Sequence, residues 1–378
     1  NDAAAFSVAV GDLARLEGIH YVIALDADTQ LPRDAAAKLI GTLAHPLVRP
    51  EVDPVRRVVT SGHAIIQPRV AVALPSARRS WFAWLASGDA GIDPYTRAVS
   101  DVYQDLFDAG SFVGKGAYEV TAFAAVANRR FPENRILSHD LLEGGYARAA
   151  LASDIVLYED HPALYLADTA RRHRWVRGDW QVARWILPWV PGPTGRGIGN
   201  PLDALARWKL LDNLRRSLVA PAWVALLVGL ACAGPLGIRL ATAALALLLL
   251  PAALPVLAAL TAPMERFAPL MQLRNAGASA LRQSAQVVLN LSTLPHQAWT
   301  NLDAVLRTWW RLLISRRRLL EWITASEGER RVRGDFKGVA LALMPGPLAA
   351  LVGVALLVWF SPPGLLALSP VLALWACA

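Results

Sequence analysis

The stretch Tyr21-Val-Ile-Ala-Leu25, followed at once by Asp26-Ala27-Asp28, decides the fold. A short apolar run with β-branched and aromatic residues predicts a buried strand, and the acidic residues after it predict a polar loop at the strand's end. Pro32-Arg33-Asp34 then introduces a helix over residues 35–43, because proline is favoured near the first turn of a helix. Strand, acidic loop and helix together indicate an α/β domain.

Other strands and helices alternate through the first 215 residues or so. We expect strands at residues 58–60 and 64–66, broken at Gly62, and at 151–157; helical parts within 76–107; a glycine-containing loop at 111–120; and an apolar helix around 122–127. Such alternation predicts layers of helices against a sheet. No internal repeat is evident.

After Arg216 the composition changes from mixed and charged to rich in Leu, Ala, Val and Pro. The whole chain is 54% hydrophobic, with a mean hydropathy of +0.34, which is high for a wholly soluble protein. A membrane span needs about 20 apolar residues. The expected spans are residues 218–234, residues 236–260 with kinks at Pro251 and Pro255, residues 338–360, and a fourth that begins at Leu365.

The net charge of +8 arises partly in residues 262–337, which are polar and strongly basic. Basic loops lie on the cytoplasmic side of a bilayer, so the charge indicates a membrane protein. No nucleic-acid motif accompanies the charge, so we expect no nucleic-acid partner. Residues 289–322 interleave tryptophan with arginine, which suits a helix on the membrane surface or, equally, a helix packed on the soluble domain.

These observations divide the chain into four parts. Residues 1–215 are a partial, cytoplasmic catalytic domain; residues 216–261 are two transmembrane helices; residues 262–337 are a basic cytoplasmic segment with the interfacial helix; and residues 338–378 are further transmembrane helices. Cys232 and Cys377 both lie in apolar stretches and form neither a disulfide framework nor a metal motif.

Asp26 and Asp28 are the candidate metal ligands. Two carboxylates two residues apart at a strand end can offer oxygen atoms to one hard cation, either Mg²⁺ or Mn²⁺. A capped loop before a helix accounts for the pattern as well. The phosphatase-type Asp-x-Asp-x-Thr motif fits poorly, because Thr29 comes one place too early and Gln30 takes the fifth place.

Asp140 is the candidate catalytic base. It lies with His139 and Glu143 at an expected helix start in Ile136-Leu-Ser-His-Asp-Leu-Leu-Glu-Gly144. A carboxylate there can deprotonate an acceptor hydroxyl. The alternative is structural: Ser138 would cap the helix, and Asp140 would favour its first turn electrostatically.

Two further motifs are candidates for substrate binding. Arg171, Arg174 and Trp175 belong to a dense run of arginines with tryptophan, which suits phosphate binding and stacking on a sugar or base. The alternative is a basic helix next to the membrane. Gly114-Lys115-Gly116 allows close backbone approach to a ligand, but it is short and unspecific, and it is not a Walker loop.

The order of these motifs resembles that of the processive inverting glycosyltransferases of the cellulose and hyaluronan synthase type, which share the GT-A fold. The resemblance implies that Asp26 and Asp28 bind metal and donor and that Asp140 is the base. It also implies that Arg171-x-x-Arg174-Trp175 lies at the channel mouth. Ser138-His139 stands where that family has Thr-Glu, so only the aspartate is carried over and His139 remains a substrate-binding candidate.

Longer strings resemble the central domain of the cyclic β-1,2-glucan synthases. These strings are Asp26-Ala-Asp-Thr-Gln-Leu-Pro-Arg-Asp34, Gly114-Lys-Gly-Ala-Tyr118, Glu133-Asn-Arg-Ile-Leu-Ser-His-Asp-Leu-Leu-Glu-Gly144, Arg172-His-Arg-Trp-Val-Arg-Gly-Asp-Trp-Gln181 and Ile314-Ser-Arg-Arg-Arg-Leu-Leu-Glu-Trp322. The resemblance implies UDP-glucose as donor, a growing β-1,2-glucan as acceptor, and the bacterial inner membrane as location. The residues alone say nothing about the linkage.

Members of that family also carry membrane helices upstream and a phosphorylase-like domain downstream. The chain starts at Asn1 and ends at Ala378 inside an apolar run, so we expect a fragment of a longer polypeptide. The first nucleotide-binding strand would precede Tyr21 and is expected to be missing. The isolated chain is therefore expected to bind UDP poorly.

Three other functions remain open at this point. A different processive membrane synthase would make a cellulose-like or chitin-like polymer, which product linkage distinguishes. A polyprenyl-phosphate glycosyltransferase would use a lipid acceptor. A transporter or membrane scaffold with a docking module would keep its function when Asp26 and Asp28 become alanine.

Overall fold

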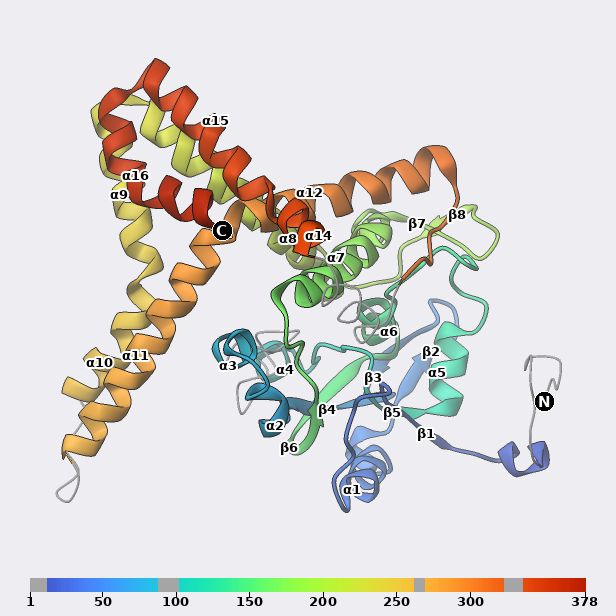
Figure 1. The fold of residues 1–378 in the computed structure, drawn as a ribbon. Helices are drawn as coiled ribbons and strands as arrows, with labels where there is room; N and C mark the ends of the chain where they lie inside the picture. The colour runs from blue at the N-terminus through green and yellow to red at the C-terminus, as the bar shows by residue number, and fades with distance from the viewer. Residues whose placement is uncertain (1–11, 88–101, 262–268, 323–335) are drawn as a thin grey trace. The chain divides into compact units, whose positions relative to one another are not determined.

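The computed structural model describes residues 12–87, 102–261, 269–322 and 336–378, and the chain divides into two compact units (Figure 1). The first unit comprises Asn1–Leu74, Asp89–His161 and Gln181–Asp212, and the second comprises Pro75–Gly88, Pro162–Trp180 and Asn213–Ala378. The first unit contains the sheet, and the second is built from helices.

A four-stranded sheet forms the centre of the first unit. Its strands are β1 (Tyr21–Ala24), β4 (Ile65–Val72), β5 (Gly116–Glu119) and β6 (Ala149–Glu159), in the order β1-β5-β4-β6. β4 and β6 are parallel, whereas β5 runs antiparallel to both of its neighbours, β1 and β4. In the β1–β5 pair Ala24 lies opposite Gly116, so the last residue of β1 meets the first residue of β5.

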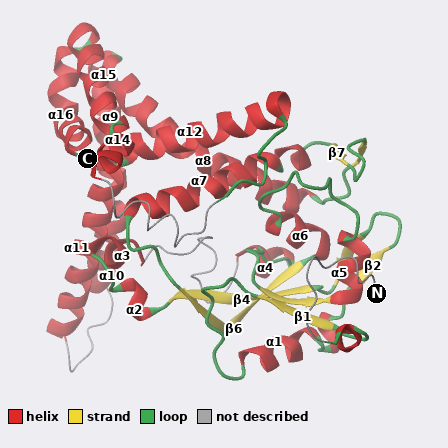
Figure 2. Cartoon of the chain, turned by 45° about the vertical axis from the view of Figure 1, so that its right-hand side comes forward, coloured by secondary structure: helices red, strands yellow, loops and turns green. Residues whose placement is uncertain are grey.

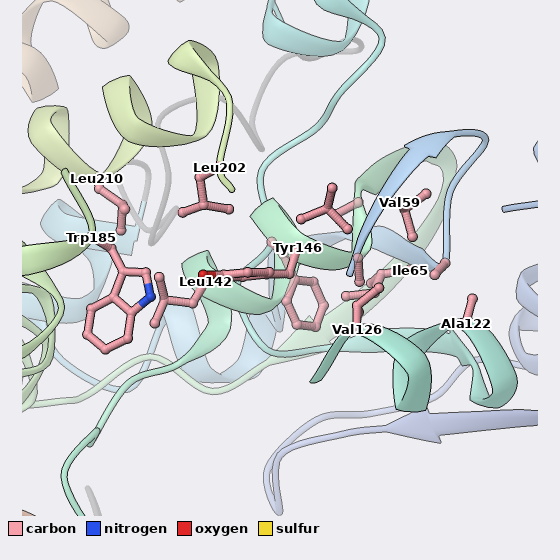
Figure 3. Packing of buried hydrophobic residues seen from close by; sticks show 14 of the residues in the cluster. Val59, Ile65, Ala122, Val126, Leu142, Tyr146, Trp185, Leu202 and Leu210 are labelled. Atoms are coloured by element: carbon pink, nitrogen blue, oxygen red, sulfur yellow. The ribbon is translucent and has the colours of Figure 1, made fainter. Parts of the chain in front are cut away.

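Hydrophobic cores lie on both faces of this sheet. Neighbouring residues of a strand point to opposite faces, and the two buried residues that open β4 show it. Ile65 packs into a cluster with Leu142 and Tyr146 of α6 (Asp140–Ala147), while Ile66 packs with Leu39 of α1 (Ala35–Leu43). Figure 2 shows α1 on one side of the sheet and α6 on the other. The larger cluster continues to Trp185 and Leu210 (Figure 3).

Shorter elements complete the first unit. They are η2 (Leu13–Leu16), η3 (Pro46–Val48), β2 (Glu51–Asp53), β3 (Val58–Ser61), α4 (Val102–Phe107), α5 (Val120–Ala127), η6 (Ala183–Ile186), β7 (Trp189–Pro191) and β8 (Gly197–Gly199). β2 pairs with β3, and β7 pairs with β8, both antiparallel. α2 (Leu74–Ala77) lies where the chain passes into the second unit.

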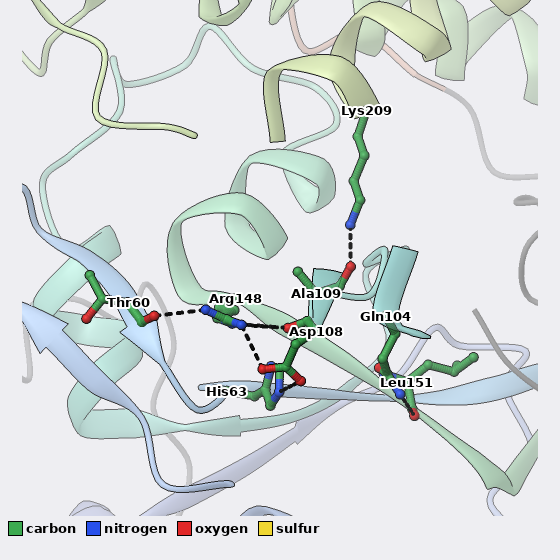
Figure 4. A network of polar contacts seen from close by, with 8 residues as sticks. All are labelled: Thr60, His63, Gln104, Asp108, Ala109, Arg148, Leu151 and Lys209. Atoms are coloured by element: carbon green, nitrogen blue, oxygen red, sulfur yellow. Dashed lines mark hydrogen bonds and ion pairs between the residues drawn. The ribbon is translucent and has the colours of Figure 1, made fainter. Parts of the chain in front are cut away.

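Arg148 fixes the junction between α6 and β6 (Figure 4). Its guanidinium group donates to the Thr60 carbonyl at 2.8 Å and to Asp108 Oδ2 at 2.7 Å. Asp108 also lies 3.4 Å from His63 Nε2. Lys209 Nζ donates to the Ala109 carbonyl at 2.8 Å. These bonds hold the segment after α4, which leads into Gly114-Lys115-Gly116.

The second unit is helical. Its elements are α3 (Trp81–Ala86), α7 (Tyr165–Gln181), most of α8 (Ala204–Cys232), α9 (Gly234–Leu248), α10 (Leu250–Thr261), α11 (Pro269–Ser292), α12 (Leu294–Trp310), the π-helix η7 (Arg311–Ser315), α14 (Phe336–Leu343), α15 (Pro345–Phe360) and α16 (Pro362–Cys377). A buried cluster joins Leu227 of α8, Leu357 of α15 and Trp375 of α16. Trp375 Nε1 donates to the Leu291 carbonyl at 2.9 Å, which ties α16 to α11.

Within the described residues, two helices have the length and composition of membrane spans: Ala204–Cys232, and the stretch Lys337–Phe360 that contains α15. α9 and α16 are apolar but shorter. The expected single span over 236–260 is instead two helices, α9 and α10, which meet at a turn at Leu249. Pro251 explains the break for two reasons. Proline has no N–H to donate to the preceding helical turn, and its ring clashes with a carbonyl group of that turn.

Several sequence predictions match these elements. The strand at 21–25, the helix at 35–43 and the strand at 151–157 are present as β1, α1 and β6. The prediction of a loop over residues 111–120 is wrong for Gly116–Glu119, which form β5 between β1 and β4. Part of the expected helical region 76–107, namely 88–101, lies outside the described residues.

The expected helix over 289–322 is divided among the end of α11, α12 and η7. Within the second unit α12 packs against α7, where Tyr165 OH and His296 Nδ1 are 2.9 Å apart. Trp299 and Trp310 of α12 are more than half exposed. Contact of these tryptophans with a membrane surface stays a prediction.

Candidate active site

The loop after β1 is tied to the end of β6. Thr29 N donates to the Asp26 carbonyl at 3.0 Å, which closes a turn. The Thr29 hydroxyl donates to Glu159 Oε1 at 3.0 Å, and Gln30 N donates to the Tyr158 carbonyl at 2.7 Å. The loop is therefore held on two consecutive residues of β6, while the Asp26 side chain remains 62% exposed.

Lys115 lies buried beneath this loop, with 3% of its side chain exposed. Its Nζ is 2.7 Å from Glu159 Oε1 and 3.0 Å from Asp26 Oδ2. Burial opposes the charge on Lys115, but the carboxylates of Glu159 and Asp26 outweigh it and raise the pKa of the ammonium group. Lys115 was predicted to contact substrate; here its ammonium is engaged by two carboxylates, and a contact with substrate stays a prediction.

The two glycines around Lys115 serve close packing. Gly114 has a φ of +89°, and a Cβ there would lie 2.9 Å from Asp140 Oδ1. Gly116 has a φ of +153°, and a Cβ there would collide with the Ile66 carbonyl of β4. Any side chain would be strained in these backbone conformations. Gly114 thus lets the loop lie against Asp140, and Gly116 lets β5 pair with β4; their predicted contact with substrate is untested.

Three side chains of the α6 start lie close together. His139 Nδ1 is 2.8 Å from Glu143 Oε1 and 3.7 Å from Asp140 Oδ1. Tyr118 of β5 donates its hydroxyl to Glu143 Oε2 at 3.5 Å. The hydrogen bond to Glu143 raises the pKa of His139, which favours an imidazolium beside Asp140. The predicted helix cap is wrong: His139 is the N-cap residue without a side-chain cap, and the Ser138 hydroxyl donates to Asp140 Oδ2 at 3.5 Å.

The Asp140 carboxyl is partly buried, with 32% of its side chain exposed. Burial raises its pKa above the ordinary value, because the charged form is poorly solvated there. Positive charge on His139 and Lys115 opposes the rise, while Glu143 and Asp26 add to it. The charges of Asp26 and Lys115 therefore both act on Asp140. That the three residues form one catalytic site stays a prediction.

In the part of the chain that the structure describes, two sets of residues have the donor atoms for a metal ion. Asp26 and Asp28 are both exposed at the loop, and their oxygen atoms match the preference of Mg²⁺ and Mn²⁺. Asp26 keeps one oxygen, Oδ1, that is not given to Lys115. His139, Asp140 and Glu143 offer ligand atoms within 4.8 Å of one another. In that second set His139 Nδ1 is already paired with Glu143, so the loop carboxylates fit a hard cation better.

Arg171, Arg174 and Trp175 lie on α7, in the second unit. Arg171 is 2.7 Å from Asp168 Oδ1, and its guanidinium lies over the Trp175 ring at 4.8 Å from the centroid. Arg174 lies over the ring of Trp322 at 5.2 Å. The buried Asp168 thus orders the motif from within its own helix. Their predicted part in the same site as Asp26 stays a prediction.

Sequence reasoning missed Glu159, which joins Lys115 to the Asp26 loop. The signal was available, because Glu159 ends an apolar strand as Asp26 follows one. Tyr118 and Asp168 were also missed, since neither stands out within its motif. Gln67 on β4 is fully buried and accepts from Val113 N at 2.6 Å, so it too shapes the approach to Lys115.

No family model matches the chain. The chain is 41% identical over 345 residues to the cyclic beta-(1,2)-glucan synthase NdvB of Rhizobium meliloti, an alignment that covers 90% of the chain. It spans 12% of the length of that protein. An identity of this size over nine-tenths of the chain confirms the predicted resemblance. The match identifies the chain as a relative of a segment of the cyclic β-1,2-glucan synthases.

Proposed function

We propose that this segment transfers glucose from UDP-glucose to a growing β-1,2-glucan, with inversion at the anomeric carbon. The observation that carries the proposal is that Asp140 lies against Gly114, next in sequence to Lys115, whose ammonium contacts Asp26. The chain is also 41% identical to a cyclic β-1,2-glucan synthase. Asp140 is partly buried and has a raised pKa, which suits a group that accepts a proton. Asp26 and Asp28 are exposed, which suits groups that bind a cation. Sites for acid–base chemistry separate their carboxylates in this way.

The proposed reaction is a direct displacement. The acceptor's 2-hydroxyl oxygen attacks the anomeric carbon of the donor glucose, and the bond from that carbon to the diphosphate oxygen breaks on the opposite side. Asp140 accepts the proton from the attacking hydroxyl. UDP leaves with the electron pair of the broken bond. His139, held by Glu143 at 2.8 Å, fixes the start of α6 so that Asp140 faces Gly114.

A divalent cation held by Asp26 and Asp28 would neutralise charge on the leaving diphosphate. The chain's own part is to present those carboxylates on a loop fixed by Thr29 and Glu159. Arg171 and Arg174 are proposed to assist the diphosphate, and Trp175 to stack near the acceptor. Gly114, Lys115, Gly116 and His139 would border the bound sugar.

We further propose that the sheet belongs to a GT-A domain and that the apolar helices hold it at the bacterial inner membrane. The α/β layering and the single antiparallel strand β5 support the first part. The two span-length apolar helices support the second, with the sheet on the cytoplasmic side because residues 262–337 are basic.

Membranes from cells that express the protein provide the test. We expect them to incorporate label from UDP-[¹⁴C]glucose into a polymer whose methylation analysis gives 2-linked glucose, and a chelator should stop the incorporation. Membranes from cells with the Asp140→Asn variant are the matched control. Polymer with 4-linked glucose would replace the proposal with a cellulose-like synthase, and label in a lipid extract would replace it with a polyprenyl-phosphate transferase.

A further inference from the structure

A buried ion bridge lies beneath the proposed cation site. Lys115 Nζ contacts Asp26 Oδ2 at 3.0 Å and Glu159 Oε1 at 2.7 Å. Glu159 is 12% exposed and Lys115 is 3% exposed, whereas Asp26 is 62% exposed. The bridge therefore leads from a buried carboxylate, through a buried ammonium, to a carboxylate that faces water.

Burial makes the free energy of these charged groups depend strongly on their partners. A charge removed from water is costly unless an opposite charge and hydrogen bonds compensate for it. Glu159 supplies the opposite charge for Lys115, and the Thr29 hydroxyl supplies a hydrogen bond to Glu159 at 3.0 Å. Lys115 is thus held by Glu159 whether or not Asp26 binds anything else, and it stays next to Asp26 Oδ2.

We propose that Glu159 and Lys115 are positioning residues that hold one oxygen of Asp26 and thereby set the affinity of the Asp26–Asp28 loop for a divalent cation. The inference rests on the proposed role of Asp26 and Asp28 as cation ligands. Lys115 takes Oδ2, so the cation is offered Oδ1 together with Asp28. It also competes with the cation for Asp26, because two positive charges share that carboxylate.

The formal charges give the expected directions. Three carboxylates (Asp26, Asp28 and Glu159) and one ammonium (Lys115) leave two negative charges for the cation. Glu159→Gln removes one of them and leaves Lys115 with Asp26 as its anionic partner. Lys115→Met removes the competitor from Asp26. A charge within about 4–6 Å changes an ionic equilibrium by roughly tenfold or more. The two single variants should therefore move cation affinity in opposite directions.

The experiment measures Mn²⁺ binding to the purified chain in detergent by electron paramagnetic resonance, with no sugar nucleotide present. We expect Glu159→Gln to bind about tenfold more weakly than the parent chain and Lys115→Met about tenfold more tightly. The double variant should bind with an affinity close to that of the parent, because it loses one negative and one positive charge and again leaves two negative charges for the cation. Asp28→Asn should bind much more weakly than the parent.

Matched controls separate local charge from total charge. Glu51→Gln and Lys38→Met make the same chemical changes at exposed positions of the first unit and should leave the affinity within about twofold, because solvent and salt screen exposed charges. The double variant guards against misfolding of Lys115→Met, since it leaves no uncompensated buried charge. Circular dichroism checks that each variant is folded.

Three results would overturn the inference: no Mn²⁺ binding by the parent chain, equal affinities for Glu159→Gln and Lys115→Met, or loss of binding in His139→Asn but not in Asp28→Asn. Each leaves the proposed transfer reaction standing if labelled 2-linked glucan is still made. If membranes with the parent protein make no glucan while the Mn²⁺ affinities follow the expected order, the proposed function is contradicted. The positioning role of Glu159 and Lys115 is then supported.

Discussion

The Asp26 loop and the start of α6 both supply carboxylates to the proposed site, yet these carboxylates are held in different ways. Asp26 contacts Lys115, and Lys115 in turn contacts Glu159 at the end of β6. Asp140 is surrounded by its own helical turn, with His139 and Glu143 as neighbours. The first arrangement fixes a carboxylate that faces water. The second withdraws a carboxylate from water and raises its pKa. In the proposed reaction, the surroundings of each aspartate, and not its residue type, decide whether it binds a cation or accepts a proton.

Replacing Asp140 is expected to have the largest effect on synthesis. Asp140→Asn keeps the shape of the side chain but removes the proton acceptor. Loss of a general base lowers rates by about 10²–10⁴-fold, and we expect glucan synthesis in membranes to fall by that factor. The KM for UDP-glucose should stay within about twofold. Asp203→Asn is the matched control, because Asp203 caps α8 through Ala206 N and asparagine caps as well. Undiminished synthesis by Asp140→Asn would remove it from the role of base.

Asp28→Asn tests the other side of the comparison and should have a smaller effect. Removing one anionic ligand is expected to raise the Mn²⁺ or Mg²⁺ concentration for half-maximal synthesis by about tenfold. Saturating cation should restore most of the rate, which it cannot do for Asp140→Asn. Asp154→Asn, at an exposed position of β6, serves as the control. An unchanged cation requirement would place the metal elsewhere.

The pH dependence of synthesis should report the ionisation of Asp140. Burial raises the pKa of Asp140, and the charge on His139 opposes that rise. Asp140 must be deprotonated to act, so activity should fall as the pH falls through its pKa. His139→Asn removes the opposing positive charge, which raises the pKa further and moves the acidic limb to higher pH by up to about one unit. A limb that stays in place or moves down would contradict the assignment.

Gly114→Ala probes the close approach of the segment before β5 to Asp140 and should have the smallest effect. The φ of +89° and the approach to Asp140 Oδ1 both disfavour a side chain. A left-handed conformation costs a residue other than glycine about 1–2 kcal/mol, so we expect lower thermal stability and a modest loss of rate. Gly41→Ala, inside α1 with open space around it, is expected to stabilise by roughly 0.5–1 kcal/mol. Calorimetry measures the melting temperatures of both variants and the parent protein. A melting temperature of Gly114→Ala equal to that of the parent would show that the segment around residue 114 relaxes away from Asp140.

Local signals explain which parts were predictable from the sequence. β1 and α1 were predicted closely, because an apolar run, an acidic loop and Pro32 mark their limits. Asp140 was found because it starts a helix beside other polar residues. β5 was missed, because it is short, starts at Gly116 and follows Lys115, and these residues indicate a loop when taken alone. Its strand character comes from pairing with β1 and β4.

Long-range partners explain the rest. Nothing near Lys115 in the sequence reveals that Asp26 and Glu159 neutralise it, because the three residues come from three separate strand ends. The break between α9 and α10 was anticipated as a kink at Pro251. The sequence does not reveal how far such a kink opens, because that depends on the helices packed around it.

The link between Thr29 and Glu159 joins residues 130 positions apart, which has a consequence for biosynthesis. A ribosome adds roughly 5–20 residues per second, so the Asp26 loop leaves the exit tunnel on the order of ten seconds before its anchor is made. Until then β4 lacks its parallel neighbour β6, and Lys115 lacks one of its two carboxylates. The anchored arrangement of Asp26, Lys115 and Glu159 is therefore among the last features that the nascent domain acquires. A chain stalled before residue 159 would expose both an unpaired strand and an unbalanced buried charge to the cell's quality control.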